Sequence, residues 1–293
     1  MTTIVRVQIV HTPRDPFADG PDALEAFSDG GLAFGTDGGI LASGDYASVR
    51  AEHPDAEVID ESGAVLLPGL VDLHVHYPQV AVIGAVGMTL LDWLATRTLP
   101  EEARLADTAY AEELARFFVR ALARNGTTTA LVFGSHFPAA QEALFAEAER
   151  AGLRITSGLV VSDRNLLPAL HATPEEAYAS SRALMDRWHG CGRLRYVVTP
   201  RFSLSCTDAM LEACGALRAD GPADVHVTSH INGNPAEIRT AESTLDSVLR
   251  HSPSADATLG ALFTLAREDA VADVRVAGET VLHAGRAVAP QLG

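Results

Sequence analysis

The chain contains no lysine, and all 22 of its basic residues are arginine. Against these arginines stand 38 acidic residues, which give a formal net charge of −16. A chain with this charge repels nucleic-acid phosphates, and no cluster of basic residues offsets the repulsion. The composition therefore argues against a nucleic-acid partner.

Cysteine and long apolar runs are also scarce. The three cysteines, Cys191, Cys206 and Cys214, form neither a CxxC pair nor an even disulfide set, which suits a reducing cytoplasm. The first residues lack the basic start and apolar stretch of a signal peptide. No apolar run approaches the roughly 20 residues of a membrane span. We therefore expect a cytoplasmic protein with no membrane partner.

The chain has 293 residues and 47% hydrophobic content, enough for one large domain or two ordinary ones. Residues 1–67 predict the N-terminal part of a small β domain, with a hairpin within residues 30–45. Residues 241–293 return to this style, with a hairpin turning at Ala277 and Gly278. We expect the two chain ends to form one small β-sandwich domain.

Between these ends, residues 68–240 predict a different fold. Strand-length apolar runs alternate with helical patterns, several of which end at glycine, and this alternation is typical of parallel βα units. A closed (β/α)₈ barrel takes about 250 residues, or about 31 per unit. The central segment therefore has room for about five units. The expected fold class is α/β, an incomplete TIM-type (β/α) barrel plus the small β-sandwich.

The run "LVDLHVH" places His74 and His76 two residues apart at the end of a predicted strand. Residues i and i+2 of a strand point to the same face, so the two rings can bind one cation, although both can also be ordinary polar residues. His230 ends the predicted strand "VHVTSH" and suits a third ligand. His226 lies about 13 Å further down that strand, too far to share the metal.

Several motifs, in this order along the chain, extend the pattern. The sequence resembles the guanine deaminases of the amidohydrolase superfamily in "PGLVDLHVHYPQ", "LLDWL", "RNGTTTALVFGS", "DRN", "RWHG", "TPRFSLSC" and "SHINGNPAE". The resemblance implies a Zn²⁺ enzyme that hydrolyses guanine to xanthine and ammonia. It implies metal ligation by His74, His76 and His230.

The resemblance also implies a set of purine contacts. Gln79 can donate to and accept from a purine edge, Arg201 can donate to the guanine carbonyl, and Phe202 can pack on the ring. Arg201 could equally be an ordinary ion-pair arginine among 22. His136 follows another strand and is a further candidate for lining the site.

Three departures from the family pattern weaken the expectation of activity. Where the family carries a proton-shuttling glutamate three residues after the fifth-strand histidine, this chain has Gly233. A sixth-strand histidine and an eighth-strand aspartate have no counterparts, which suggests an internal deletion after about residue 240. No catalytic residue can therefore be assigned securely, and we expect little turnover.

Two other interpretations stay open. The chain could be a catalytically inactive relic that binds zinc or a purine, or a deaminase of another amino-heterocycle. The motifs around Gln79 and Arg201 favour guanine among such substrates. A homodimer is a candidate assembly.

Overall fold

The computed structural model describes residues 1–231 and the strands within 273–276, 279–283 and 286–287. The chain divides into two compact units, residues 1–70 and residues 71–293. Each unit is described below by itself.

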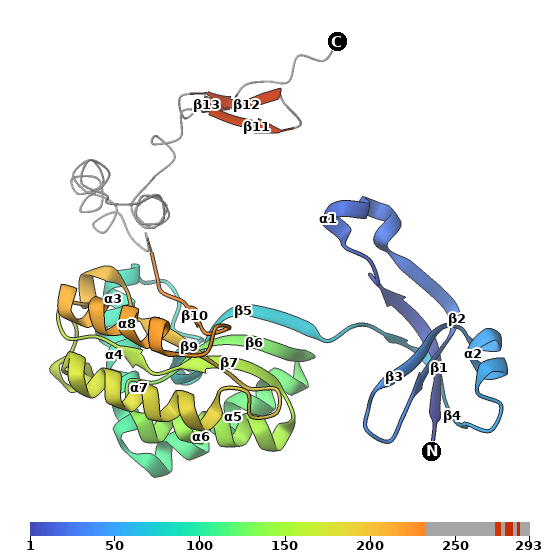
Figure 1. Ribbon diagram of the computed structural model, residues 1–293, viewed down its shortest axis with the longest axis horizontal. Helices are drawn as coiled ribbons and strands as arrows, with labels where there is room; N and C mark the ends of the chain where they lie inside the picture. Colours follow the sequence, from blue (N-terminus) through green and yellow to red (C-terminus); the bar gives the residue numbers. More distant parts are fainter. Residues whose placement is uncertain (232–272, 277–278, 284–285, 288–293) are drawn as a thin grey trace. The chain divides into compact units, whose positions relative to one another are not determined.

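The N-terminal unit is built on a four-stranded sheet with strand order β3-β2-β1-β4 (Figure 1). The predicted hairpin is confirmed, because β2 and β3 pair antiparallel around a glycine-rich turn. β1 runs antiparallel to β2 and parallel to β4. The elements are β1 (Thr3–His11), α1 (Pro16–Asp19), a 3₁₀ turn (Gly20–Ala23), β2 (Glu25–Phe34), β3 (Ile40–Asp45), α2 (Tyr46–Glu52) and β4 (Glu57–Leu66).

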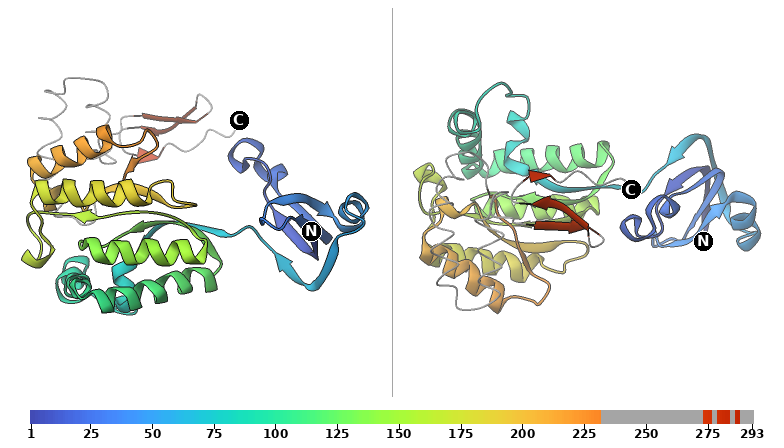
Figure 2. Two further views of the ribbon diagram at one scale, coloured as in Figure 1. Left: turned by 60° about the horizontal axis from the view of Figure 1, so that its bottom comes forward. Right: turned by 90° about the horizontal axis from the view of Figure 1, so that it is seen from above.

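The second unit contains a six-stranded sheet in the order β10-β9-β7-β6-β5, with β8 also paired to β9. The strands lie beside one another in chain order (Figure 2), and the recorded pairs β6–β7, β7–β9, β8–β9 and β9–β10 are parallel. This is the arrangement of a partial TIM-type barrel, as expected from the five predicted strands. The strands are β5 (Leu70–His76), β6 (Thr127–Phe133), β7 (Arg154–Gly158), β8 (Val160–Val161), β9 (Arg195–Pro200) and β10 (His226–Val227).

Helices connect these strands, and local sequence signals explain where the longest begin and end. Asp107 caps the start of α5 by accepting from two backbone N–H groups, and Thr173 forms a capping box with Glu176 at α7. Gly152 ends α6 in the left-handed conformation that glycine adopts without strain. The helical elements are α3 (Leu90–Trp93), α4 (Leu99–Ala103), α5 (Thr108–Arg124), α6 (Pro138–Ala151), α7 (Pro174–Trp188) and α8 (Asp208–Asp220), with a π-helical turn at Leu94–Thr98 and 3₁₀ turns at Tyr77–Val82, Arg104–Ala106, Pro168–Leu170 and Ser203–Ser205.

A continuous apolar core joins the helices to the sheet. α5 packs on α6, α6 on α7 and α7 on α8, and the buried residues of these helices meet those of the strands, Phe145 and Ile155 among them. In the part of the chain that the structure describes, no helix combines the length and apolarity needed to cross a membrane. The core thus fixes the ends of the strands, where the candidate site lies.

The C-terminal strands form a small sheet of their own, in which β11 (Asp273–Val276), β12 (Glu279–His283) and β13 (Arg286–Ala287) pair antiparallel. The pairing of Val276 with Glu279 agrees with the predicted hairpin. The prediction that both chain ends build one β-sandwich, with boundaries at residues 67 and 240, stays a prediction.

Candidate metal and purine site

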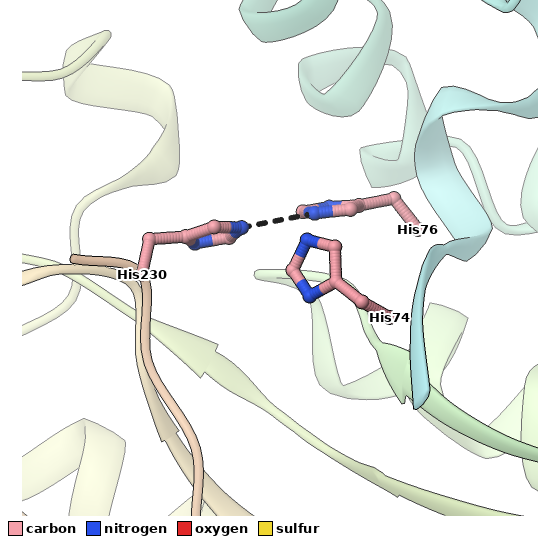
Figure 3. Close-up of side chains that lie close together, drawn as sticks. All are labelled: His74, His76 and His230. Carbon is pink, nitrogen blue, oxygen red and sulfur yellow. Dashed lines mark hydrogen bonds between the residues drawn. The ribbon is translucent and has the colours of Figure 1, made fainter. Parts of the chain in front are cut away.

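Three histidines meet beside the ends of the first and last strands of the six-stranded sheet. His74 and His76 project from β5 toward His230, as Figure 3 shows. One nitrogen of each ring lies within 4.8 Å of the others, and the Nε2 atoms of His76 and His230 are 3.0 Å apart. The structure therefore brings together all three residues that the sequence nominated as metal ligands.

The surrounding backbone and one aromatic ring hold these histidines. The backbone N–H of His230 donates to the Arg201 carbonyl at 3.1 Å, and the His230 Nδ1 donates to the same oxygen at 2.9 Å. The Phe133 ring lies 4.1 Å from the His230 ring and stacks on His76 at 4.8 Å, centroid to centroid. β10 is shorter than predicted, so His230 is placed by its bridge to Phe202 and not by a regular strand.

The donor set fits a zinc ion. Tetrahedral zinc with nitrogen ligands at about 2.0–2.1 Å places those nitrogens about 3.3 Å apart. The Nε2 atoms of His76 and His230 are 3.0 Å apart, and all three histidines offer a nitrogen within 4.8 Å of the others. Because Nδ1 of His230 donates to a carbonyl, its Nε2 presents a lone pair, which is the usual support for a ligating histidine. His76 Nδ1 faces the amide nitrogen of Gln79 at 3.0 Å. In this arrangement Nδ1 of His76 accepts from Gln79, and Nε2 carries the ring proton and donates it to His230 Nε2, so ligation of a metal through His76 Nε2 displaces that proton.

A buried ion pair lies beside the histidines. Arg201, at the end of β9, donates from Nη1 and Nη2 to the two carboxylate oxygens of Glu102, with Nη2 at 3.1 Å from Oε1. The side chains are 7% and 3% exposed, respectively. A guanidinium cannot deprotonate in a protein, so its burial requires a charged partner. The alternative that Arg201 forms an ion pair is thus confirmed, but the pair is buried within the site.

Two further predicted residues join this pair. Gln79 donates from Nε2 to Glu102 Oε1 at 2.9 Å, which links the ion pair to His76. His136, a candidate for lining the site, has its Nε2 at 3.2 Å from Arg201 Nη1 and 3.6 Å from Glu102 Oε2. Side chains from three segments of the chain therefore converge on one carboxylate.

The buried surroundings keep His76, His136 and His230 neutral. The pKa of His76 is lowered to about 3, chiefly by burial and also by the proximity of His230. Burial also lowers the pKa of His230 and of His136. For Glu102 burial alone raises the pKa, but the charge of Arg201 and hydrogen bonds from His136 and Arg201 outweigh it, so its pKa falls. At neutral pH His76, His136 and His230 are therefore uncharged and lie near the ionised carboxylate of Glu102.

Comparisons with known proteins identify the family of this chain. The model of the Amidohydrolase family matches residues 65–281, which is most of the chain. This chain belongs to the amidohydrolase family. A probable guanine deaminase from Deinococcus radiodurans is 59% identical over 239 residues, covering 80% of this chain and 54% of that protein. The guanine deaminase of Escherichia coli is 38% identical over 229 residues, covering 77% of this chain and 52% of that protein.

A solved structure of E. coli guanine deaminase superposes with a TM-score of 0.78 at 34% identity, covering 89% of this chain and 59% of that one. The chain spans about half the length of the curated relatives it matches. In this amidohydrolase, the described residues include the cluster of His74, His76 and His230, together with the hydrogen-bond network at Arg201.

Sequence reasoning missed Glu102. The signal was indirect, because a buried arginine at a strand end requires a carboxylate, but nothing indicates which of 38 acidic residues provides it. His226 is exposed on β10 and is not part of the described histidine cluster, as expected. Phe202 is half-buried, and its backbone pairs with His230. Gly233, at the family's proton-shuttle position, lies outside the described residues.

Proposed function

We propose that His74, His76 and His230 bind a zinc ion. The support is their convergence within 4.8 Å, together with the hydrogen bond that orients His230. When bound, zinc lowers the pKa of a coordinated water to about 7 and so supplies hydroxide near neutral pH. The neutral state of His76 and His230 keeps their lone pairs available to the metal.

The proposed ligand is guanine, and the reaction of the lineage is its hydrolytic deamination to xanthine and ammonia. Arg201 offers N–H donors suited to the purine carbonyl, Gln79 offers an amide to its N–H edge, and Phe202 offers a ring face. The 59% identity to a probable guanine deaminase supports this substrate over other amino-heterocycles. The single observation that carries the proposal is the contact of Gln79 with His76 and of the Arg201 backbone carbonyl with His230, which places both residues next to the histidine cluster.

Turnover by this chain alone is proposed to be slow. Glycine at position 233 cannot transfer a proton, and general acid–base catalysis is worth about 10²–10⁴-fold. An inactive zinc- or purine-binding protein is therefore the second candidate, and Gly233 is the observation that favours it. Cytoplasmic location and a homodimer stay predictions.

Two measurements on the zinc-loaded protein test these proposals: zinc content after dialysis, and guanine loss by ultraviolet absorbance. We expect about one zinc per chain, and turnover at least 100-fold below that of the D. radiodurans relative. His230→Ala should abolish tight zinc binding, whereas His226→Ala, a matched change four residues earlier, should not. Equal zinc content in both variants would contradict the ligand assignment. Turnover near that of the relative would contradict slow catalysis.

Restoring the acid tests why turnover is slow. We expect Gly233→Glu to raise the rate only slightly, because the sixth- and eighth-strand residues of the family pattern have no counterpart in the sequence. Gly233→Gln serves as the uncharged control. A rise of 100-fold or more in the glutamate variant alone would show that the missing proton carrier was the main defect.

A further inference from the structure

The Glu102 carboxylate contacts several polar side chains of the site, although the sequence did not predict it as a site residue. Glu102 lies on the short helix α4 and is 2% exposed. It accepts hydrogen bonds from Arg201 and Gln79, and His136 lies beside it. A buried carboxylate gains little stability over an apolar side chain, since desolvation offsets its attraction to a partner. Its presence therefore suggests a task beyond packing.

The contacts of Arg201 restrict how that side chain can point. Both terminal nitrogens engage the two oxygens of Glu102, an arrangement that fixes the guanidinium plane. Nη1 also faces His136 Nε2. The donors that do not face Glu102 or His136, including Nε, are consequently held in one direction. A guanidinium locked in this way loses little conformational entropy when it donates to a ligand.

Gln79 is oriented by the same carboxylate. An ionised carboxylate only accepts hydrogen bonds, so the amide must turn its NH₂ group toward Glu102. The amide oxygen then points away and is left to accept an N–H from a ligand. Reversing the amide would place two acceptor oxygens about 2.9 Å apart, which is repulsive.

We infer that Glu102 is a positioning residue that sets the hydrogen-bond polarity of the purine site. Through its contacts, Arg201 presents donors and Gln79 presents an acceptor. This pattern matches a ligand that carries a carbonyl beside N–H groups, as guanine does. The inference rests on the proposed function and deepens it, because it names the residue that discriminates guanine from purines without the carbonyl.

A purely structural role for Glu102 predicts a different result. If Glu102 only neutralised Arg201, its loss would lower the stability of the protein and would weaken the binding of all purines alike. A positioning role also changes the ratio of two affinities. A site whose buried polar groups are left unpaired rejects the analogue that lacks the matching atom. The ratio for guanine over 2-aminopurine, which has the amine but no carbonyl, isolates this effect.

The experiment measures both affinities on zinc-loaded protein. Binding of 2-aminopurine is followed by its fluorescence and binding of guanine by competition. Glu102→Gln removes the charge, and Glu102→Asp keeps the charge but withdraws the carboxylate by one methylene. Glu101→Gln is the matched control, because Glu101 is the adjacent acid, is also buried, and contacts Arg104 and Tyr110 instead.

We expect the guanine preference to fall at least tenfold in Glu102→Gln and several-fold in Glu102→Asp, with zinc content and the Glu101→Gln ratio unchanged. Glu102→Asp keeps the buried pair charged, so it decides the matter if Glu102→Gln does not fold. An unchanged ratio in a folded Glu102 variant, while the unaltered protein prefers guanine, would overturn this inference and leave the proposed function intact. Absence of guanine binding to the unaltered protein would instead overturn the proposed function.

Discussion

Two arginines of this chain each donate from two nitrogens to a carboxylate, one at the surface and the other in the interior. In the N-terminal sheet, Arg6 donates from Nε and Nη2 to Asp29 at 2.7 and 2.9 Å, and the side chains are 36% and 51% exposed. In the α/β unit, Arg201 and Glu102 are 7% and 3% exposed. The chemistry of the two pairs is the same, whereas the solvent around them differs.

The difference shows which ion pair can control a site. Water screens the exposed pair and competes for its hydrogen bonds, so either partner can be lost without leaving a buried charge. In the interior, replacing either partner leaves the charge of the other buried and unpaired. The buried pair is therefore suited to holding side chains in fixed directions, at the price of stability if it is broken.

The largest expected effect comes from breaking the buried pair. Glu102→Gln leaves the Arg201 charge without its counterion, and such a loss costs about 3–5 kcal/mol of unfolding free energy. Urea unfolding followed by tryptophan fluorescence measures it, because both tryptophans, Trp93 and Trp188, lie in the α/β unit. A loss below about 1 kcal/mol would show that water reaches Arg201 and that the contrast between the two pairs is weak.

The second effect is the loss of stability in acid, which should begin at a higher pH in the α/β unit than in the N-terminal sheet. The pKa of His76 in the folded metal-free protein is lowered to about 3 by burial and by His230, so the unfolded chain binds more protons below pH 6.5. Stability is complete above pH 6.5 and is lost as the pH falls. This group alone removes about 2 kcal/mol between pH 7 and pH 5.

The N-terminal sheet should respond to acid at a lower pH. The pKa of Asp29 is lowered by its hydrogen bond to Arg6, and that of Asp60 by hydrogen bonds from Ser62. Stability from lowered carboxylates is lost only as the pH falls below about 3.8. Hydrogen exchange of the metal-free protein at pH 7 and pH 5 should thus show that protection falls more in β6 than in β1 at the lower pH. Equal weakening would contradict the assignment of the shift to His76.

A third effect should be equal in the two regions. Thr173 caps α7 through Glu176 N at 3.2 Å, and Asp45 caps α2 through Ser48 N, also at 3.2 Å. Replacing either cap by alanine should cost about 1 kcal/mol, because the lost contact is local in both cases. Urea unfolding of both variants, with hydrogen exchange to locate the weakened helix, measures this. A much larger loss at Thr173 would mean that the regions differ in more than solvent exposure.

Much of the fold could be predicted because its signals are local or periodic. The apolar runs that gave β5, β6, β7 and β9 were confirmed, as were the helices that end at Gly152 or begin at Thr173. The helix α2 was not predicted, since seven residues hold barely two turns of periodicity. The sequence predicted a longer strand than the observed β10, because nothing in the sequence marks where this strand ends.

The site was predictable only in part. The spacing of His74 and His76 predicts that their side chains point to the same face, because side chains along a strand alternate between its two faces. The association of Glu102 with Arg201 joins residues 99 positions apart and arises from tertiary packing. A single helical turn such as α4 has no periodicity from which to infer which acid faces inward. Partners of a buried charge therefore need a structure.

The smallest expected effect comes from breaking the exposed pair. Asp29→Asn removes one charge from the contact with Arg6, and Asp60 lies 3.9 Å from the same guanidinium and can compensate. We expect no measurable change in the urea midpoint at 0.15 M salt and a slight loss at low salt, where screening is weaker. The matched removal of charge at Glu102 should be insensitive to salt, because ions do not enter the core. If Asp29→Asn proved as damaging as Glu102→Gln, burial would not be what separates the two pairs.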